Sequence, residues 1–325
     1  MKKLMTITIV LLLGISGTVP AQFNKAGRTT FQFLKIGVGG RAAAMGEAVI
    51  ANTQDINSVY WNPAGLTGLE NLEAGVNYTQ WIADLSVTSA AVGYNLGPAS
   101  IAFNYMGLNY GNIQEAMTRG TSVDTRTGRT FTGSDLALGV TLARRFTDQL
   151  SIGVNVKYLR ENLFTFTSSL WAADIGTYYD TQWKGIRIAM TAQNFSKQAR
   201  WMYTGDETEQ SYELPLVFRI GTSMDLWGGE GLVFGGDASM NKLTVNIDAI
   251  HTNDYGERLH VGGEYVFMNM LSLRAGYRMN YEEGNLALGA GFKTELSGVK
   301  LEVDYAYVKY DFLESPHRFS LIFAF

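Results

Sequence analysis

The residue types that carry catalysis and metal binding are few in this sequence and lie far apart. Its three histidines, His251, His260 and His317, fall near the ends of separate predicted strands, where imidazoles are most often solvated or hydrogen-bonded. The chain has no cysteine and no G-x-S-x-G, P-loop or H-E-x-x-H motif. We therefore predict no catalytic residue, no metal site and no cofactor, and a protein that is not an enzyme.

Two short stretches have some features of ligand-binding loops. Gly205-Asp206-Glu207-Thr208-Glu209 groups carboxylates of the kind that Ca²⁺ prefers, but it lacks the spacing of a calcium loop. We interpret it as a solvated outer loop. Gly37-Val38-Gly39-Gly40 lacks the third glycine of a phosphate-binding loop, and no parallel βαβ unit surrounds it. We interpret it as a flexible entry to a helix.

Charged residues of both signs recur on one face of neighbouring predicted strands. These residues are Asp248, Glu264, Arg274, Arg278, Lys293, Glu302, Asp304 and Arg318. If the strands close into a barrel, this face is the inner one, and the interleaved signs predict a salt-bridged ladder across the lumen. In our interpretation these residues neutralise one another's charges in an interior partly filled by side chains and water. The alternative is that they line a path for a substrate.

The elements that would position these residues are strands. Alternation of apolar and polar residues dominates the 325-residue chain, for example over Leu136, Leu138, Val140 and Leu142. The pattern predicts about fourteen antiparallel strands, at 73–79, 85–96, 99–106, 135–146, 150–162, 169–180, 185–195, 214–226, 242–251, 257–267, 271–281, 284–294, 299–310 and 317–325. A weaker stretch, 232–238, is assigned to a turn region.

Composition and loop lengths favour a membrane barrel over a soluble sandwich. Charged residues are 17% and aromatic residues 12% of the chain, and 36 residues are glycine. A net charge of -4 leaves no basic surface for nucleic acid. The long connections Gly107–Gly133 and Ser196–Glu213 fall at one end of the barrel and short turns at the other, as in bacterial outer-membrane barrels. Trp227–Asn241 is the exception, because it is long at the short-turn end.

The N-terminal region does not alternate. Lys2 and Lys3, an apolar run over 4–15 and the end at Ala21 predict a secretory signal peptide at 1–21, and no later run reaches the length of a membrane helix. Residues 22–66 are predicted to form a helical plug and 67–325 the barrel.

Within the plug, two helices are expected. Residues 41–48 form a strong helical run, and 55–61 form a second helix with Asp55 as its N-cap. Asn62 then takes a left-handed conformation and Pro63 prevents continuation, which turns the chain from the lumen into the wall.

The last strand ends with aromatic and aliphatic residues on one face. These residues are Phe319, Leu321, Phe323 and Phe325. A final strand of this kind resembles the signal that outer-membrane assembly machinery reads, so we expect that machinery as a partner, together with outer-membrane lipid.

The stretch GVGGRAAAMGEAVIANTQDINSVYWNPAGL, Gly37 to Leu66, resembles the N-terminal signature of the PorV/PorQ family, within the wider FadL-like group. In that group an Asn-Pro-Ala element lies in the N-terminal hatch. The matching plug motif here is Trp61, Asn62, Pro63, Ala64 and Gly65. The resemblance implies a fourteen-stranded barrel with a lumenal plug in the outer membrane of a Gram-negative bacterium.

The resemblance also implies function. PorV-like proteins serve type IX secretion, where they receive cargo by its C-terminal domain for surface attachment, so secretion components or cargo domains are expected partners. FadL-like relatives instead admit hydrophobic molecules such as long-chain fatty acids, and such a channel is the alternative. A structural barrel that caps another membrane complex is a third class.

Overall fold

The computed structural model describes residues 27–119, 122–203, 206–229 and 231–325. The predicted signal peptide, 1–21, lies outside the described residues. None of the helices in these ranges is long and apolar enough to cross a membrane. The helices are η1 Gln32–Lys35, α2 Gly40–Ala44, α3 Ser58–Trp61 and η2 Pro63–Gly68.

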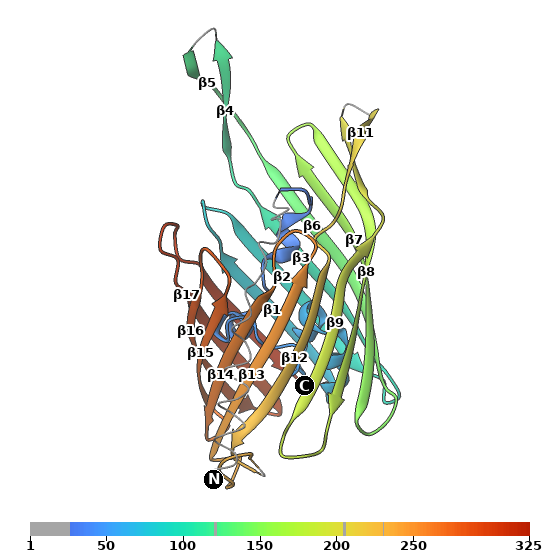
Figure 1. Cartoon of the computed structure of the whole chain (residues 1–325), viewed down its shortest axis with the longest axis vertical. Coiled ribbons are helices and arrows are strands. Elements are labelled where there is room, and N and C mark those ends of the chain that lie inside the picture. Colours follow the sequence, from blue (N-terminus) through green and yellow to red (C-terminus); the bar gives the residue numbers. More distant parts are fainter. Residues whose placement is uncertain (1–26, 120–121, 204–205, 230) are drawn as a thin grey trace.

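Fourteen antiparallel strands of the described chain form a closed barrel (Figure 1). They are β1 Leu72–Gln80, β2 Ser86–Asn95, β3 Ser100–Asn109, β6 Gly133–Arg145, β7 Leu150–Leu163, β8 Phe166–Asp180, β9 Arg187–Ser196, β12 Val217–Trp227, β13 Asn241–Thr252, β14 Arg258–Phe267, β15 Leu271–Met279, β16 Leu286–Leu296, β17 Val299–Val308 and β18 His317–Ala324. Pairing of β1 with β18 and of β8 with β9 leaves no edge in the ring. The predicted fourteen-stranded barrel is confirmed.

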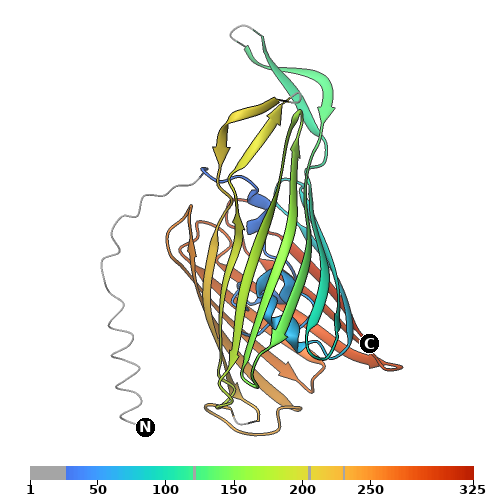
Figure 2. The same cartoon turned by 90° about the vertical axis from the view of Figure 1, so that its right-hand side faces the viewer.

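Four further strands lie outside the ring. β4 Ile113–Arg119 pairs with β5 Ser122–Phe131 as a separate hairpin, and β10 Ala199–Tyr203 pairs with β11 Asp206–Tyr212 and with the upper end of β8. Both hairpins rise from the same end of the barrel (Figures 1 and 2). We call this the hairpin end and the opposite one the turn end.

The two ends differ as the loop lengths predicted. The long connections that contain β4–β5 and β10–β11 lie at the hairpin end, and the connection between β12 and β13 lies at the turn end (Figure 1). Within that connection, 232–238 contributes only isolated bridges, at Phe234 and Gly236, and no barrel strand. The acidic stretch predicted as a loop falls partly outside the described residues, and Asp206 opens β11.

The outer face of the wall is apolar. Side chains alternate between exposed and buried along most strands, and exposed apolar residues such as Trp171 (66%) and Leu273 (64%) point away from the lumen. Exposure of so much apolar surface to water is unfavourable, so this face is suited to contact with the acyl chains of a bilayer. The strands β6, β7 and β8, of 13, 14 and 15 residues, exceed the roughly 9–11 residues that cross a bilayer, so they extend beyond it.

Glycines on the inner face leave room for the lumenal segment. A Cβ at Gly153 would overlap the backbone of Pro63, and one at Gly276 would overlap the backbone of Gly46. The glycines with such a contact are Gly75, Gly93, Gly153, Gly176, Gly221, Gly262, Gly276 and Gly289, from eight strands. At each of these positions the absence of a side chain lets the lumenal segment contact the wall.

The local conformations predicted for the lumenal segment are partly wrong. α2 stops at Ala44, because Gly46 and Glu47 take positive φ angles of 62° and 64°. The N-cap of α3 is Asn57, and Asp55 instead accepts a hydrogen bond from the Asn57 N–H. Asn62 is extended, with φ −147° and ψ 103°, rather than left-handed.

Replacing Gly262 with valine is expected to displace the lumenal segment, because the new side chain would overlap the backbone of Met45. Overpacking of this kind typically costs about 1–3 kcal/mol. Gly263, the next residue of β14, has open space around its Cβ position, so Gly263→Val is the matched control. Limited proteolysis of the folded barrel in detergent measures the effect; equal protease resistance of the two variants would contradict it.

Candidate functional site

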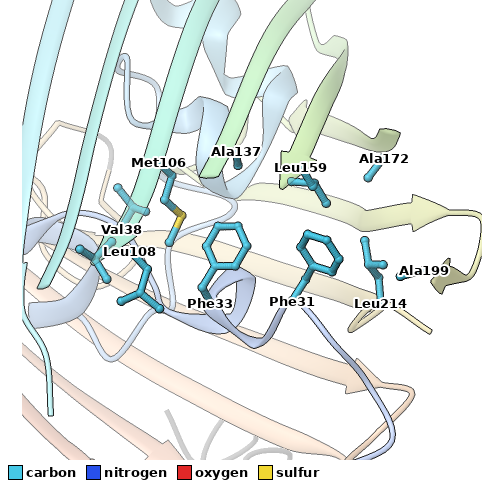
Figure 3. Packing of buried hydrophobic residues seen from close by; sticks show 11 residues of the cluster. Phe31, Phe33, Val38, Met106, Leu108, Ala137, Leu159, Ala172, Ala199 and Leu214 are labelled. Atoms are coloured by element: carbon cyan, nitrogen blue, oxygen red, sulfur yellow. The ribbon is translucent and has the colours of Figure 1, made fainter. Parts of the chain in front are cut away.

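The segment 27–68, which we call the plug, runs through the lumen from the hairpin end toward the turn end (Figure 2). At the hairpin end the Phe31 N–H donates to Glu161 Oε2 at 2.9 Å. Phe31 and Phe33 pack against Leu159, Met106 and neighbouring apolar side chains of the wall (Figure 3). This part of the lumen is therefore filled by an apolar cluster.

Deeper in the lumen, plug and wall meet through buried charges. Arg41 of α2 donates from Nε and Nη2 to the two oxygens of Glu264 on β14, at 3.0 and 2.8 Å. Arg274 of β15 donates to the same carboxylate at 2.6 Å and to Asp304 of β17. Glu302 lies 3.6 Å from Arg274. These bonds link one plug residue to three strands.

A second group of charges surrounds Glu47. Its Oε1 lies 3.3 Å from Arg278 Nη1 and 3.2 Å from Arg318 Nη1, and all three side chains are buried. Burial raises the pKa of Glu47, but the two guanidinium charges more than offset this and lower it from 4.5 to about 2. Glu47 therefore stays ionised. The left-handed backbone at this residue costs about 1–2 kcal/mol, which these ion pairs offset.

Polar side chains of the wall also hold the plug backbone. Asp248 Oδ2 accepts from the N–H groups of Val49 and Ile50 at 2.8 and 3.1 Å. The Asn246 side chain donates to the Ala48 carbonyl at 2.8 Å. Because buried backbone groups are costly to leave unpaired, these contacts fix the path of the irregular stretch after α2.

The predicted plug motif lies against β7 and β8. The Trp61 indole donates to the Val38 carbonyl at 2.9 Å. Asn62 donates to the carbonyls of Ile50 and Thr177 and caps η2 by accepting from the Ala64 N–H. Pro63 occupies the first position of η2, where its missing N–H is not needed. Ala64 and Gly65 are buried in this short helix.

The structure divides the eight residues of the predicted charge ladder into two groups. Five form one connected series across β14 to β17: Glu264, Arg274, Asp304, Glu302 and Lys293, the last lying 3.7 Å from Glu302. The other three, Asp248, Arg278 and Arg318, contact the plug, as Glu264 of the first group also does through Arg41. The inner-face charges therefore bind plug and wall together as well as joining strands.

The remaining predicted residues lie elsewhere. His251 contacts Glu257, His260 contacts Tyr281 and His317 contacts Tyr305, and the described residues contain no group of three metal-ligating side chains. Phe319, Leu321 and Phe323 lie on β18 opposite Tyr78, Val76 and Ala74 of β1, at the seam that closes the barrel, and Phe325 follows them.

Sequence reasoning missed Arg41 and Glu47, which anchor the plug. Both fall in a run that reads as an ordinary helix, and their partners Glu264 and Arg318 lie more than two hundred positions away. The only available signal was a pair of opposite charges within an otherwise small and apolar stretch of the plug.

The geometry thus describes a β-barrel closed by a bonded plug. A family model described as "Type IX secretion system protein PorV" matches residues 19–249. The chain belongs to the PorV family. It is an outer-membrane β-barrel protein by family and fold.

Two of the solved structures similar to this PorV-family barrel are a hydrocarbon channel and a toluene transporter. The "CymD monoaromatic hydrocarbon channel" aligns at TM-score 0.59 and 11% identity, over 89% of this chain and 98% of that one. The P. putida "toluene transporter TodX" aligns at TM-score 0.57 and 10% identity, over 89% and 97%. At this identity the likeness shows the fold alone. No curated protein sequence matches the chain.

Replacing Glu47 with glutamine is expected to loosen the plug at neutral pH, because Arg278 and Arg318 lose their shared counter-charge. Removing one partner of a buried pair typically costs about 3–5 kcal/mol. Because the folded-state pKa of Glu47 is lowered, its contribution is present above pH 4.5 and is lost as the pH falls toward about 2.

Urea unfolding in detergent, followed by intrinsic tryptophan fluorescence between pH 7 and 2, tests both effects. Wild-type stability should fall more steeply over the acid range than that of Glu47→Gln. Glu257→Gln, at an exposed residue of the hairpin end, is the control. Parallel pH profiles for wild type and Glu47→Gln would show that this carboxylate does not hold the plug.

Proposed function

We propose that this PorV-family barrel is a non-enzymatic component of type IX secretion that meets exported cargo at its hairpin end. In this proposal the signal peptide 1–21 directs export, the assembly machinery reads the last strand up to Phe325, and the hairpin end faces outward. The observation that carries it is a surface built by the strands that rise above the bilayer.

This surface, which we call the crest, consists of β4–β5, β10–β11 and the upper ends of β7 and β8. Phe131 and Phe164 lie 5.1 Å apart between ring centroids, and Phe166 stacks on Tyr203 at 4.8 Å. Phe164 is 61% and Tyr203 47% exposed. Exposed aromatic side chains held by strands are typical anchors of protein interfaces.

The closed lumen supports a role in protein contact rather than open conduction. The space between the plug and the wall strands β3, β6 to β9 and β12, lined by Tyr60, Lys157 and Arg219 among others, is about 50 Å³. Typical small-molecule sites measure roughly 300–1,000 Å³. A solute would have to displace the bonded plug before it crossed the barrel.

Deleting both outer connections, Gly107–Gly133 and Ser196–Glu213, and bridging each gap with a short turn is expected to abolish binding of a cargo C-terminal domain. Transfer of the two connections to an unrelated barrel should transfer binding. A pull-down with the purified C-terminal domain of an exported protein measures both. Shortening 228–240 at the turn end is the control; unchanged binding after the double deletion would exclude the crest as the contact surface.

The second candidate is a channel for hydrophobic small molecules, and the observation that favours it is the fold shared with TodX and CymD. In this case the plug is a gate whose position depends on Asn62, since that side chain bonds both Ile50 of the plug and Thr177 of β8. A purely structural partner of another membrane complex would use the crest as the first proposal does.

Asn62→Ala or Pro63→Ala is expected to increase passage of labelled long-chain fatty acid into proteoliposomes if the barrel is a channel. The control is Asn253→Ala, which alters a polar side chain of an outer loop that contacts Glu213 and Leu214. Uptake equal to that of protein-free liposomes, in wild type and both plug variants, would remove the channel from consideration.

A further inference from the structure

A cavity of about 730 Å³ lies at the turn end, between the plug and the wall around β14 to β17. It is more than ten times larger than the space of about 50 Å³ on the other side of the plug. Its size falls within the range of roughly 300–1,000 Å³ that ligand sites occupy. The contacts that seal the lumen leave this volume open.

The charges that line the cavity do not balance. Six acidic side chains, Asp55, Glu70, Glu73, Glu264, Glu295 and Glu302, line it together with four basic ones, so acidic groups outnumber basic groups by two. Glu295 is exposed and has no ion-pair partner among the described residues. Glu73 accepts a hydrogen bond from the Ile56 N–H at 3.0 Å but pairs with no cation in that part of the chain.

The pKa of Asp55 reflects the acidic and basic groups around it. Burial raises its pKa, Arg41 at 3.6 Å lowers it, and the charge of Glu302 raises it again. The side chain also accepts the Asn57 N–H at 2.8 Å. Asp55 and Glu73 therefore accept hydrogen bonds from the backbone just before α3. Among the described residues Asp55 pairs with one cation, Arg41, and Glu73 pairs with none.

Part of the cavity lining is apolar. Met268 and Met270, in the turn between β14 and β15, line it and are 47% and 44% exposed. Methionine side chains are flexible and polarizable, and they suit surfaces that accept varied apolar groups. The cavity therefore joins an anionic wall to an adaptable apolar rim.

We propose that this cavity binds a basic and partly apolar protein segment, whose Lys or Arg side chains meet Asp55, Glu73 and Glu295 while its apolar side chains meet Met268 and Met270. A divalent cation fits less well, because the described residues contain no group of three ligands placed to hold one. A small amine would use the anionic wall and leave the methionine rim unused. The inference is independent of the cargo role of the crest.

The test uses the full-length barrel in neutral phosphatidylcholine nanodiscs and a fluorescent eight-residue peptide with two lysines and two valines among glycine and serine. Anisotropy should show saturable binding that weakens with added salt, since surface charge attraction is screened. A twin peptide with glutamate in place of lysine should not bind. Absence of saturable binding by the lysine peptide overturns the proposal.

Amino-acid substitutions test whether the peptide binds in this cavity. Glu295→Gln changes an exposed side chain on which folding does not depend, and it should weaken binding several-fold; adding Glu73→Gln should bring the loss to at least tenfold. Met268→Ser should also weaken binding, while Glu257→Gln at the hairpin end should not. Equal affinity of Glu295→Gln, Met268→Ser and the control, or displacement of the peptide by equimolar butylamine, would overturn the proposal.

Discussion

The need to balance buried charge between plug and wall is the constraint on which this molecule depends. Arg41 and Glu47 lie in the lumen, where neither can be left without a partner at acceptable cost. Strands β14 to β18 supply the partners from their inner faces, while their outer faces stay apolar for lipid. Inner-face glycines then let the plug backbone come close enough for these bonds to form.

The wall was predictable because each of its residues faces one of two very different environments. Alternation such as Leu136, Leu138 and Val140 against small or polar neighbours fixes strand, face and register, since a slip of one residue would expose charges to lipid. That rule located fourteen strands and put the charged ladder on the inner face. It says nothing of which lumenal charge meets which.

The plug and the crest follow no such rule. Helix propensity over 41–48 favours a longer helix, but the positive φ angles of Gly46 and Glu47 end α2 at Ala44. Asn62 is extended and donates to carbonyls of two other segments. Hairpin β4–β5 lies in a connection that the sequence analysis treated as a loop. The hairpin projects beyond the bilayer, where contact with lipid does not impose an alternating pattern. Long-range bonds decided these conformations.

The seam between β1 and β18 has a consequence for biogenesis. The plug precedes every barrel strand in the sequence, yet Glu47 bonds Arg318 and Gly40 bonds Ser320, both on the last strand. These contacts span 271 and 280 positions of the sequence, so the entropy cost of loop closure favours their formation late in folding. The lumen is therefore sealed in the same late event that closes the cylinder, and a nascent, unclosed barrel is also an unplugged one.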